Sequence, residues 1–254
     1  RLETVSNLDE VERLSDGGTS NEFASVFNTV SLVRQKLLPS IGFIGFCGAP
    51  WTVASYMIEG GSSKRLKALA IAVQNPPWFQ LLIARLVETS ITYLLGQIAA
   101  GVQVVQIFDS WAGDIPFDIR GRVVNDPIRQ IVDGVRKAHP GFPVIVFARG
   151  VGGGHADVAL ATKATAVGVE QDVAVRDVLK SLPSAVAVQG NLAPNILLES
   201  DDIVRREVRK VLVGVPKARH IFNLGHGIVP QVMPETVSVL VDAVRNFDSE
   251  HVDV

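Results

Sequence analysis

Residues 102–110 read VQVVQIFDS, in which a largely apolar run at 102–108, rich in β-branched residues, is followed by an aspartate and a serine. A continuous apolar run of this length is typical of a strand that is buried on both faces, as in a parallel sheet. Similar runs recur along the chain at 41–47, 143–148, 166–170, 185–189 and 220–224. The pattern therefore predicts six parallel strands spread over most of the sequence.

Stretches with helical periodicity separate these runs. After the second strand, the expected helices occupy 125–138, 157–164, 173–182, 200–212 and 234–247. The longer gap between the first two strands holds three more, at 51–58, 63–74 and 76–100. The chain opens with two others, at 8–14 and 21–38, around a loop at 15–20. Strands that alternate with helices in this way indicate βαβ units.

Six such units fit either a doubly wound open sheet or part of an eight-stranded barrel. Polar residues follow most of the predicted strands, among them Ser110, Arg149, Asp172, Asn191 and His226. Both folds bind ligands at the carboxyl ends of their strands. The pattern therefore locates a site without choosing between the two folds.

Composition narrows the class of protein further. The chain has 254 residues, 47% of them apolar, which is enough for one large domain over 1–254. A formal net charge of −2 offers no field that would attract nucleic acid or an acidic membrane. We find no run of about 18 uncharged apolar residues, so we expect no transmembrane helix. The single cysteine, Cys47, excludes an intrachain disulfide and a Cys-rich metal site, and fits a reducing compartment.

Four segments carry a more specific pattern. They read IGFCGAPWT at 44–52 with SYMIEG at 55–60, QIFDSWAG at 106–113, QGNL at 189–192 and NLGHGI at 223–228. In this order and spacing they resemble uroporphyrinogen decarboxylase, from about residue 1 to residue 247. The resemblance implies a TIM (βα)8 barrel, a cytoplasmic homodimer, no cofactor and no metal. It also implies decarboxylation of the four acetate side chains of uroporphyrinogen to give coproporphyrinogen, in haem synthesis.

The resemblance also implies that part of the barrel is absent from the sequence. Family members carry two further strands before a point like Arg1, with an Arg-rich motif and an aspartate that faces the pyrrole nitrogens. The six strands would then be the third to the eighth, and the barrel would be incomplete. The sequence also begins without Met, so we expect that an upstream segment has been removed or left out, and that residues 1–254 alone are inactive. Two smaller departures are Ala193 where the family has Asp, and 170–172, where Glu-Gln-Asp replaces Leu-Asp-Trp.

The resemblance assigns roles to five residues. Tyr56 and His226 become catalytic and substrate-binding residues, because a phenol and an imidazole can both bind carboxylates. Ser110 becomes a hydrogen-bond donor to substrate, and Phe46 and Phe108 an apolar platform for the macrocycle. Without the resemblance, each residue has an ordinary structural role. Tyr56 would be a half-buried tyrosine whose hydroxyl is hydrogen-bonded, and His226 a structural histidine with its ring nitrogens hydrogen-bonded. Ser110 would cap a helix, and Phe46 and Phe108 would belong to the core.

Several other residues near strand ends could have a functional or a structural role. Arg149 could pair with a propionate of the substrate, or could cap a helix or lie at the surface. His155 follows the glycines at 152–154 and carries no assigned role. Asp109 and Asp172 are the nearest acids at strand ends, and the resemblance gives neither of them the role of the absent aspartate.

Two other functions compete with decarboxylation. Related methyltransferases that act on thiols need a zinc site of His and Cys residues, which a single Cys argues against. A chain that lacks two strands and the aspartate could instead be a vestigial tetrapyrrole-binding partner protein. Decarboxylation itself needs no cofactor, because a protonated pyrrole ring can accept the electrons that carbon dioxide leaves behind.

Overall fold

The computed structural model describes residues 3–14, 22–61 and 63–247, and the chain divides into two compact units. Unit 1 comprises residues 1–151 and 157–164, and unit 2 comprises 152–156 and 165–254. Each is described by itself below. The expectation of one domain over 1–254 stays a prediction, and the expected loop at 15–20 lies outside the described residues.

Unit 1 is built on three parallel strands: β1 (Ile44–Gly48), β2 (Val104–Asp109) and β3 (Val144–Ala148). Gly48 lies beside Phe108, and Phe108 beside Phe147, so the carboxyl ends of the three strands meet along one edge. The predicted strands are confirmed here, each within three residues of its predicted ends.

Unit 2 also contains three parallel strands: β4 (Ala166–Gly168), β5 (Ala187–Gln189) and β6 (His220–Ile221). They are shorter than predicted. An isolated parallel bridge from Leu192 to Leu224 continues the pairing of the last two segments beyond their strands. All six predicted strands are therefore present, and every pairing described within a unit is parallel, as predicted.

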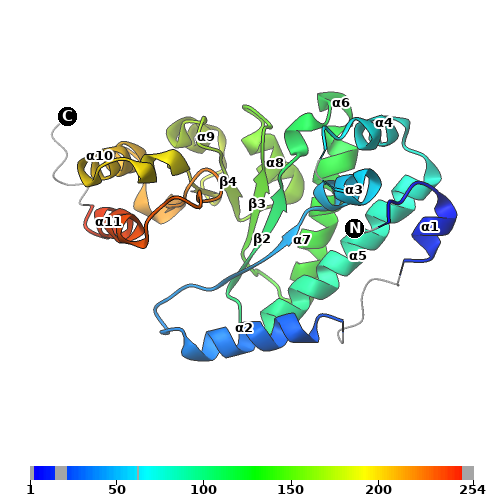
Figure 1. Ribbon diagram of the computed structural model, residues 1–254, viewed down its shortest axis with the longest axis horizontal. Coiled ribbons are helices and arrows are strands. Elements are labelled where there is room, and N and C mark those ends of the chain that lie inside the picture. Colours follow the sequence, from blue (N-terminus) through cyan, green and yellow to red (C-terminus); the bar gives the residue numbers. More distant parts are fainter. Residues whose placement is uncertain (1–2, 15–21, 62, 248–254) are drawn as a thin grey trace. The chain divides into compact units, whose positions relative to one another are not determined.

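The helices of unit 1 are α1 (Leu8–Glu12), α2 (Ala24–Lys36), α3 (Pro50–Glu59), α4 (Leu66–Gln74), α5 (Pro77–Ala99), α6 (Phe117–Arg120) and α7 (Asp126–Ala138), with α8 (His155–Thr162) following β3. Helices α3 and α5 pack against the strands of the unit, and most of its other helices pack on these two or on α7 (Figure 1). Helix α7 buries Ile128, Ile131, Val132 and Val135, as its spacing predicts, and it packs against α5.

Helix α5 is the longest helix in the described part of the chain. By length and composition alone it could cross a membrane, although it carries Arg85 and Glu88. In unit 1 it packs against β1, α3 and α7, which is the environment of a helix that covers a sheet. The absence of a membrane-spanning helix stays a prediction.

Unit 2 has its own small core between helices and strand ends. Helices α9 (Val175–Ser181), α10 (Asp201–Leu212) and α11 (Pro234–Arg245) follow β4, β5 and β6. Five buried side chains form the centre of this core: Leu192, Leu197, Val204, Val208 and Leu240. Amphipathic α10 and α11 pack against each other over it.

Several short helical segments were not expected from the sequence. They are 3-10 turns at Ala112–Asp114, Pro194–Leu198 and Lys217–Arg219, the single turn α6, and a π-helical turn at Gly121–Asn125 that leads into α7. Such segments are too short to show a clear periodicity, so the sequence does not predict them.

The outer edge of β1 is closed by a side chain. Ala49 donates to Phe108 O and Gln103 donates to Phe43 O, so alternate residues of β1 point their backbone groups toward β2. Phe46 therefore points its N–H and C=O the other way. The buried Gln97 side chain of α5 binds both groups, at 3.0 Å each.

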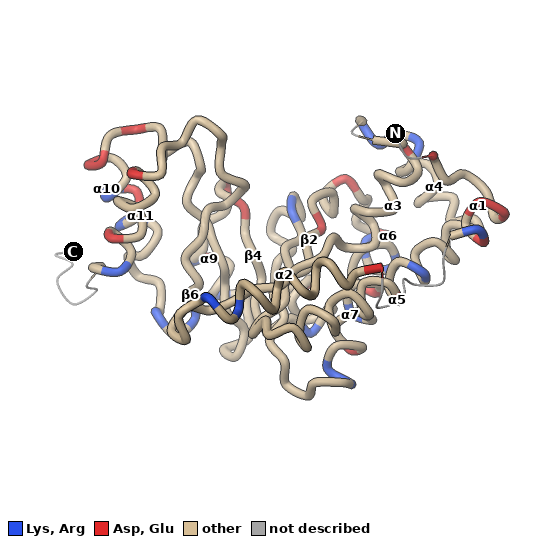
Figure 2. The backbone as a smooth tube through the Cα atoms, turned by 60° about the horizontal axis from the view of Figure 1, so that its bottom comes forward, with Lys and Arg blue, Asp and Glu red and all other residues tan. Residues whose placement is uncertain are grey.

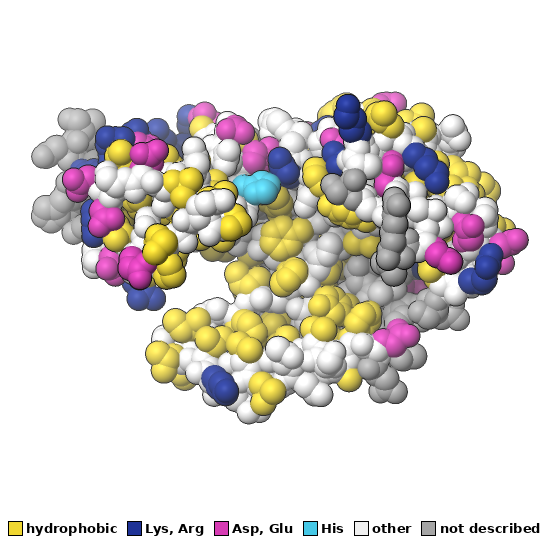
Figure 3. Space-filling view, in the orientation of Figure 1, with side chains coloured by type: hydrophobic (Ala, Val, Ile, Leu, Met, Phe, Trp, Pro, Cys, Tyr) yellow, Lys and Arg dark blue, Asp and Glu magenta, His cyan; other side chains and the backbone are white. Residues whose placement is uncertain are grey.

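One face of this sheet carries apolar side chains that are not fully covered. Within β1, Ile44 and Phe46 are exposed, while the alternate residues Gly45 and Cys47 are buried. Beside β1 lies an apolar groove, visible above α2 in Figure 3. It is lined by Phe23, Val26, Phe46, Cys47, Gly48, Val53, Leu86, Thr89, Ser90 and Tyr93.

Charged side chains are almost absent from the strands, which are nearly all tan in Figure 2. Among the six strands, Asp109 is the single Asp, Glu, Lys or Arg residue. Burial of a carboxyl group is costly unless it has partners, so this residue marks a position of interest at the end of β2.

Candidate functional site

Three phenylalanine rings form a row across the sheet of unit 1. The ring centroids of Phe46 and Phe108 lie 5.9 Å apart, and those of Phe108 and Phe147 also lie 5.9 Å apart, with both pairs edge-on. Phe46 is 60% exposed. The row contains both phenylalanines predicted from the sequence, together with Phe147, which was not predicted. It offers an apolar surface near the carboxyl ends of the strands.

Tyr56 lies on α3, the helix that directly follows β1. The helix begins at Pro50 and ends at Gly60, whose positive φ of 73° favours glycine. Trp51 and Ser55 are buried, whereas Tyr56 is 43% exposed. Its ring centroid lies 6.4 Å from that of Trp111. No hydrogen bond binds its hydroxyl among the described residues, so the hydroxyl is free to bind a ligand.

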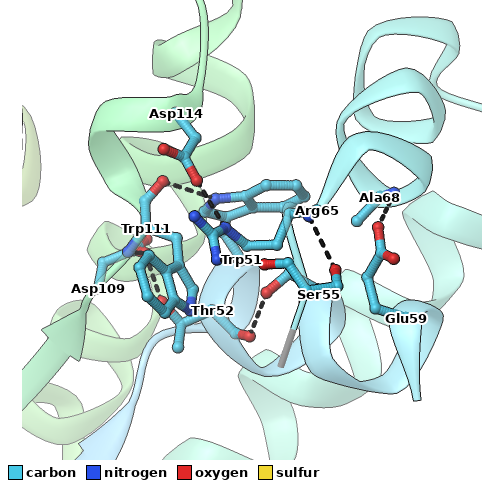
Figure 4. A network of polar contacts seen from close by, with 10 residues as sticks. Trp51, Thr52, Ser55, Glu59, Arg65, Ala68, Asp109, Trp111 and Asp114 are labelled. Atoms are coloured by element: carbon cyan, nitrogen blue, oxygen red, sulfur yellow. Dashed lines mark hydrogen bonds and ion pairs between the residues drawn. The ribbon is translucent and has the colours of Figure 1, made fainter. Parts of the chain in front are cut away.

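Ser110 is the first residue of the loop after β2. It directly precedes Trp111, whose ring lies near that of Tyr56. The loop is held in place by the backbone carbonyl of Trp111, which accepts a hydrogen bond of 3.0 Å from Trp51 Nε1 (Figure 4). The Ser110 hydroxyl has no intrachain hydrogen bond in the described part of the chain. The loop is therefore fixed while its serine remains available.

Asp109 joins this loop to α3. Its Oδ1 accepts hydrogen bonds from Thr52 Oγ1 at 2.7 Å and from Trp111 N at 3.4 Å, while its Oδ2 is buried without a partner in the described structure. Complete burial raises the pKa of Asp109 to about 6, an effect that the Thr52 hydroxyl and the Trp111 N–H partly oppose and that Asp114 adds to. Asp109 thus ties α3 to the loop after β2, instead of capping the next helix.

An arginine covers the Trp111 ring. Arg65 places its guanidinium carbon 3.6 Å from the ring centroid, and its Nε forms an ion pair of 2.6 Å with Asp114 (Figure 4). Arg65 has a positive φ of 56°, at the start of α4. Arg149 lies 5.9 Å from the same ring. The contact between Arg65 and Asp114 could not be predicted from the sequence, because the two residues are 49 positions apart.

His226 belongs to unit 2, where a glycine sets its loop. A Cβ on Gly225 would lie 2.3 Å from the backbone nitrogen of Gln171, so only glycine fits. His226 itself is exposed. Unit 1 thus places Phe46 beside Phe108, and Tyr56 near Trp111, the residue after Ser110, while His226 lies on a loop after β6 in unit 2.

A buried contact between a histidine and a glutamate lies in the same unit. His155 is 2% exposed, and its Nε2 lies 3.1 Å from Glu170 Oε2. The Glu170 carbonyl accepts a hydrogen bond of 2.8 Å from Asn191 Nδ2. His155, which the sequence left without a role, therefore helps to fix the segment after β4. His220 Nε2 donates a hydrogen bond of 2.6 Å to Gly190 O, and burial lowers the pKa of His220.

The donor set for a metal is poor in the described ranges. No group of three or more His, Cys, Asp or Glu side chains there could hold a metal ion. Burial raises the pKa of Cys47 to about 12, so its thiol stays protonated near neutral pH and is a poor zinc ligand. The polar groups of unit 1 instead suit recognition of an organic anion beside an apolar surface.

The six parallel strands, each followed by helical structure, with polar side chains at their carboxyl ends, define an α/β protein of the TIM-barrel class. Comparison with known proteins then assigns the family. Residues 2–247 match the family described as Uroporphyrinogen decarboxylase (URO-D), and the chain belongs to that family of carboxy-lyases.

Curated relatives carry the same name. The uroporphyrinogen decarboxylase of Ruegeria pomeroyi is 38% identical over 96% of this chain and 72% of its own length. That of Granulibacter bethesdensis is 40% identical over 94% of this chain and 71% of its own length. The resemblance stated from the four sequence segments is therefore confirmed.

Solved structures support the fold. A methyltransferase from Methanosarcina mazei has a TM-score of 0.74 and 21% identity, covering 88% of this chain and 64% of its own. A putative vitamin-B12 independent methionine synthase from Listeria monocytogenes has a TM-score of 0.54 and 10% identity, covering 88% of this chain and 70% of its own. At these identities the likeness concerns fold alone. The predicted class, an incomplete TIM barrel with six visible strands, is confirmed.

Proposed function

We propose that this protein decarboxylates the four acetate side chains of uroporphyrinogen and releases coproporphyrinogen, without a cofactor. The observation that carries the proposal is the free Tyr56 hydroxyl on the helix that follows β1, near the Trp111 ring, in a unit whose sheet also carries a row of partly exposed phenylalanines. A pyrrole macrocycle has an apolar face and a rim of carboxylates. An apolar platform flanked by unpaired hydrogen-bond donors is complementary to that shape.

The reaction makes few demands on the protein. A proton adds to a carbon of the pyrrole ring, and the bond to the carboxylate carbon breaks, so its electrons enter the cationic ring and carbon dioxide leaves. A second proton adds to the resulting methylene, and the ring carbon loses the first. Each acetate thus becomes a methyl group with net uptake of one proton. The protein has to hold the ring, orient the acetate and deliver protons.

The described residues divide these tasks. Phe46 and Phe108 hold the face of the macrocycle by burial of apolar surface. Tyr56 and Ser110 donate hydrogen bonds to carboxylates, and His226 pairs with another carboxylate when protonated. Asp109 and Arg65 act on these groups only indirectly, by fixing α3 and the loop that follows β2.

The test is an anaerobic assay of the full-length gene product with uroporphyrinogen, followed by separation of the oxidised porphyrins. We expect intermediates with seven, six and five carboxylates, and then a product with four. The rate should survive treatment of the protein with a chelator. If a folded full-length protein makes none of these products, the proposal is wrong.

A homodimer in the cytoplasm accompanies this proposal, on the strength of the family. Light scattering of the purified full-length protein would show a mass of twice the chain. The family and the poorly placed thiol both weigh against a zinc-dependent methyltransferase. Stoichiometric zinc in the freshly purified protein would reopen that alternative.

A further inference from the structure

Arg149 is held at a fixed point beside the loop of Ser110. Its backbone nitrogen donates to Asp109 O at 2.9 Å, and its backbone oxygen accepts from Gly113 N at 2.8 Å. The chain segments are so close here that a Cβ on Gly113 would lie 2.4 Å from Gly150 O. The backbone of Arg149, and with it the start of the side chain, is therefore fixed relative to Ser110.

The charge of Arg149 is not neutralised within unit 1. The other arginine at the Trp111 ring, Arg65, forms an ion pair with Asp114 at 2.6 Å. Arg149 forms no ion pair or side-chain hydrogen bond in the described part of the chain, and its described contact is with the Trp111 ring at 5.9 Å. A guanidinium at that distance from an aromatic ring gains little, so its five N–H donors remain available.

Two more unpaired donors surround the same ring. The Tyr56 ring lies 6.4 Å from the Trp111 ring, and Ser110 precedes Trp111 in the chain. In contrast, Thr52 is bound to Asp109 and Arg65 to Asp114, and the Asp109 Oδ2 and Trp111 Nε1 atoms, which have no partner in the described residues, are buried. The unpaired groups that are not buried belong to Tyr56, Ser110 and Arg149, and each of them can donate hydrogen bonds to an anion.

Building on the proposed function, we propose that Arg149 and Ser110 form a subsite for a propionate of the tetrapyrrole, at the edge of the Trp111 ring. Propionate follows from the chemistry. A guanidinium that pairs with a reacting acetate stabilises the carboxylate that must be lost, and so opposes its loss. A propionate keeps its charge through all four decarboxylations, so the same ion pair can hold the ring in every one of them.

Coproporphyrin, which carries four propionates and no acetate, is the probe for this subsite. Its affinity for the full-length protein can be measured by fluorescence. We expect Arg149→Gln to weaken binding roughly tenfold to a hundredfold, the effect of losing a bidentate charge-assisted pair. Arg149→Lys should recover part of that loss. Arg129→Gln, which removes a charge in surface ion pairs of α7, should bind as the wild type does.

Unchanged coproporphyrin affinity in Arg149→Gln would overturn the subsite, as would an Arg149→Lys variant that binds as weakly as Arg149→Gln. Weaker binding of uroporphyrin alone would also overturn it, because the subsite would then take an acetate. If Arg149→Gln does not unfold cooperatively, Arg149→Met replaces it and must show the same loss. The wild type is assayed for decarboxylation in parallel. An inactive wild type whose coproporphyrin affinity depends on Arg149 would contradict the proposed function and leave the subsite standing.

Discussion

The buried carboxyl of Asp109 should make the stability of unit 1 depend on pH. Its pKa of about 6 in the folded protein exceeds the ordinary value of 3.8, so the folded chain binds this proton more tightly than the unfolded chain does. The resulting stabilisation is fully present below about pH 4 and is lost as the pH rises through about 6. We expect it to fall by about 1 to 2 kcal/mol between pH 5 and pH 8.

The variant Asp109→Asn removes the titration and keeps the size of the side chain. Its amide oxygen can still accept hydrogen bonds from Thr52 and Trp111. The unfolding free energy of the variant should therefore not show the fall between pH 5 and pH 8. The difference in unfolding free energy between the wild type and the variant should change by about 1 to 2 kcal/mol from pH 5 to pH 8.

Urea unfolding at several pH values between 5 and 8 would measure this difference. All three tryptophans lie in unit 1, so their fluorescence reports the unit that contains Asp109. Asp118→Asn, which changes an exposed aspartate of the same unit, is the matched control and should follow the wild type. If the curves of Asp109→Asn and the wild type run parallel across the whole range, burial does not raise this pKa and the reasoning is refuted.

Three other substitutions test separate parts of the structure. Tyr56→Phe in the full-length protein should slow decarboxylation by roughly one to two orders of magnitude, because one hydrogen bond to a charged group is lost; unchanged rates at limiting and saturating substrate would remove Tyr56 from the site. Phe46→Ser should weaken uroporphyrin binding about tenfold and change the unfolding free energy by less than about 0.5 kcal/mol, since the ring is 60% exposed. Gln97→Leu should lower the unfolding free energy by about 1 to 3 kcal/mol in a urea titration, because two backbone groups of Phe46 lose their partner; a stability equal to that of the wild type would show that water replaces the amide.

The fold could be predicted from the sequence because its signal is local and repeated. Each strand is a short apolar run, and the spacing of residues such as Ile128 and Ile131 defines a helical face within one segment. The turns between 112 and 125 were missed because each has at most five residues, too few for a helical period to repeat. The π-helical turn at Gly121–Asn125 has no characteristic amino-acid composition by which it could be recognised in the sequence.

The candidate site was predictable only in part. Tyr56 and Ser110 stand in segments that resemble a family, so they could be named from the sequence. The contact of Arg65 with Trp111 depends on how α4 folds back toward the loop after β2, and no spacing along the chain records it. The raised pKa of Asp109 likewise follows from complete burial, which a lone aspartate at the end of a run does not reveal.

Because the Gln97 side chain binds the backbone of Phe46, part of the outer edge of β1 already has its hydrogen bonds without a neighbouring strand. The amide of Gln97 gives Phe46 one donor and one acceptor, which is what a neighbouring peptide would give. A strand that joins this edge must therefore displace the amide, and at Phe46 it exchanges hydrogen bonds instead of adding them. The exchange is nearly neutral, so apolar side chains entering the groove beside β1 must supply the driving force. At Phe46 this edge therefore offers no unpaired backbone group, which reduces the tendency of an open sheet edge to pair with any strand.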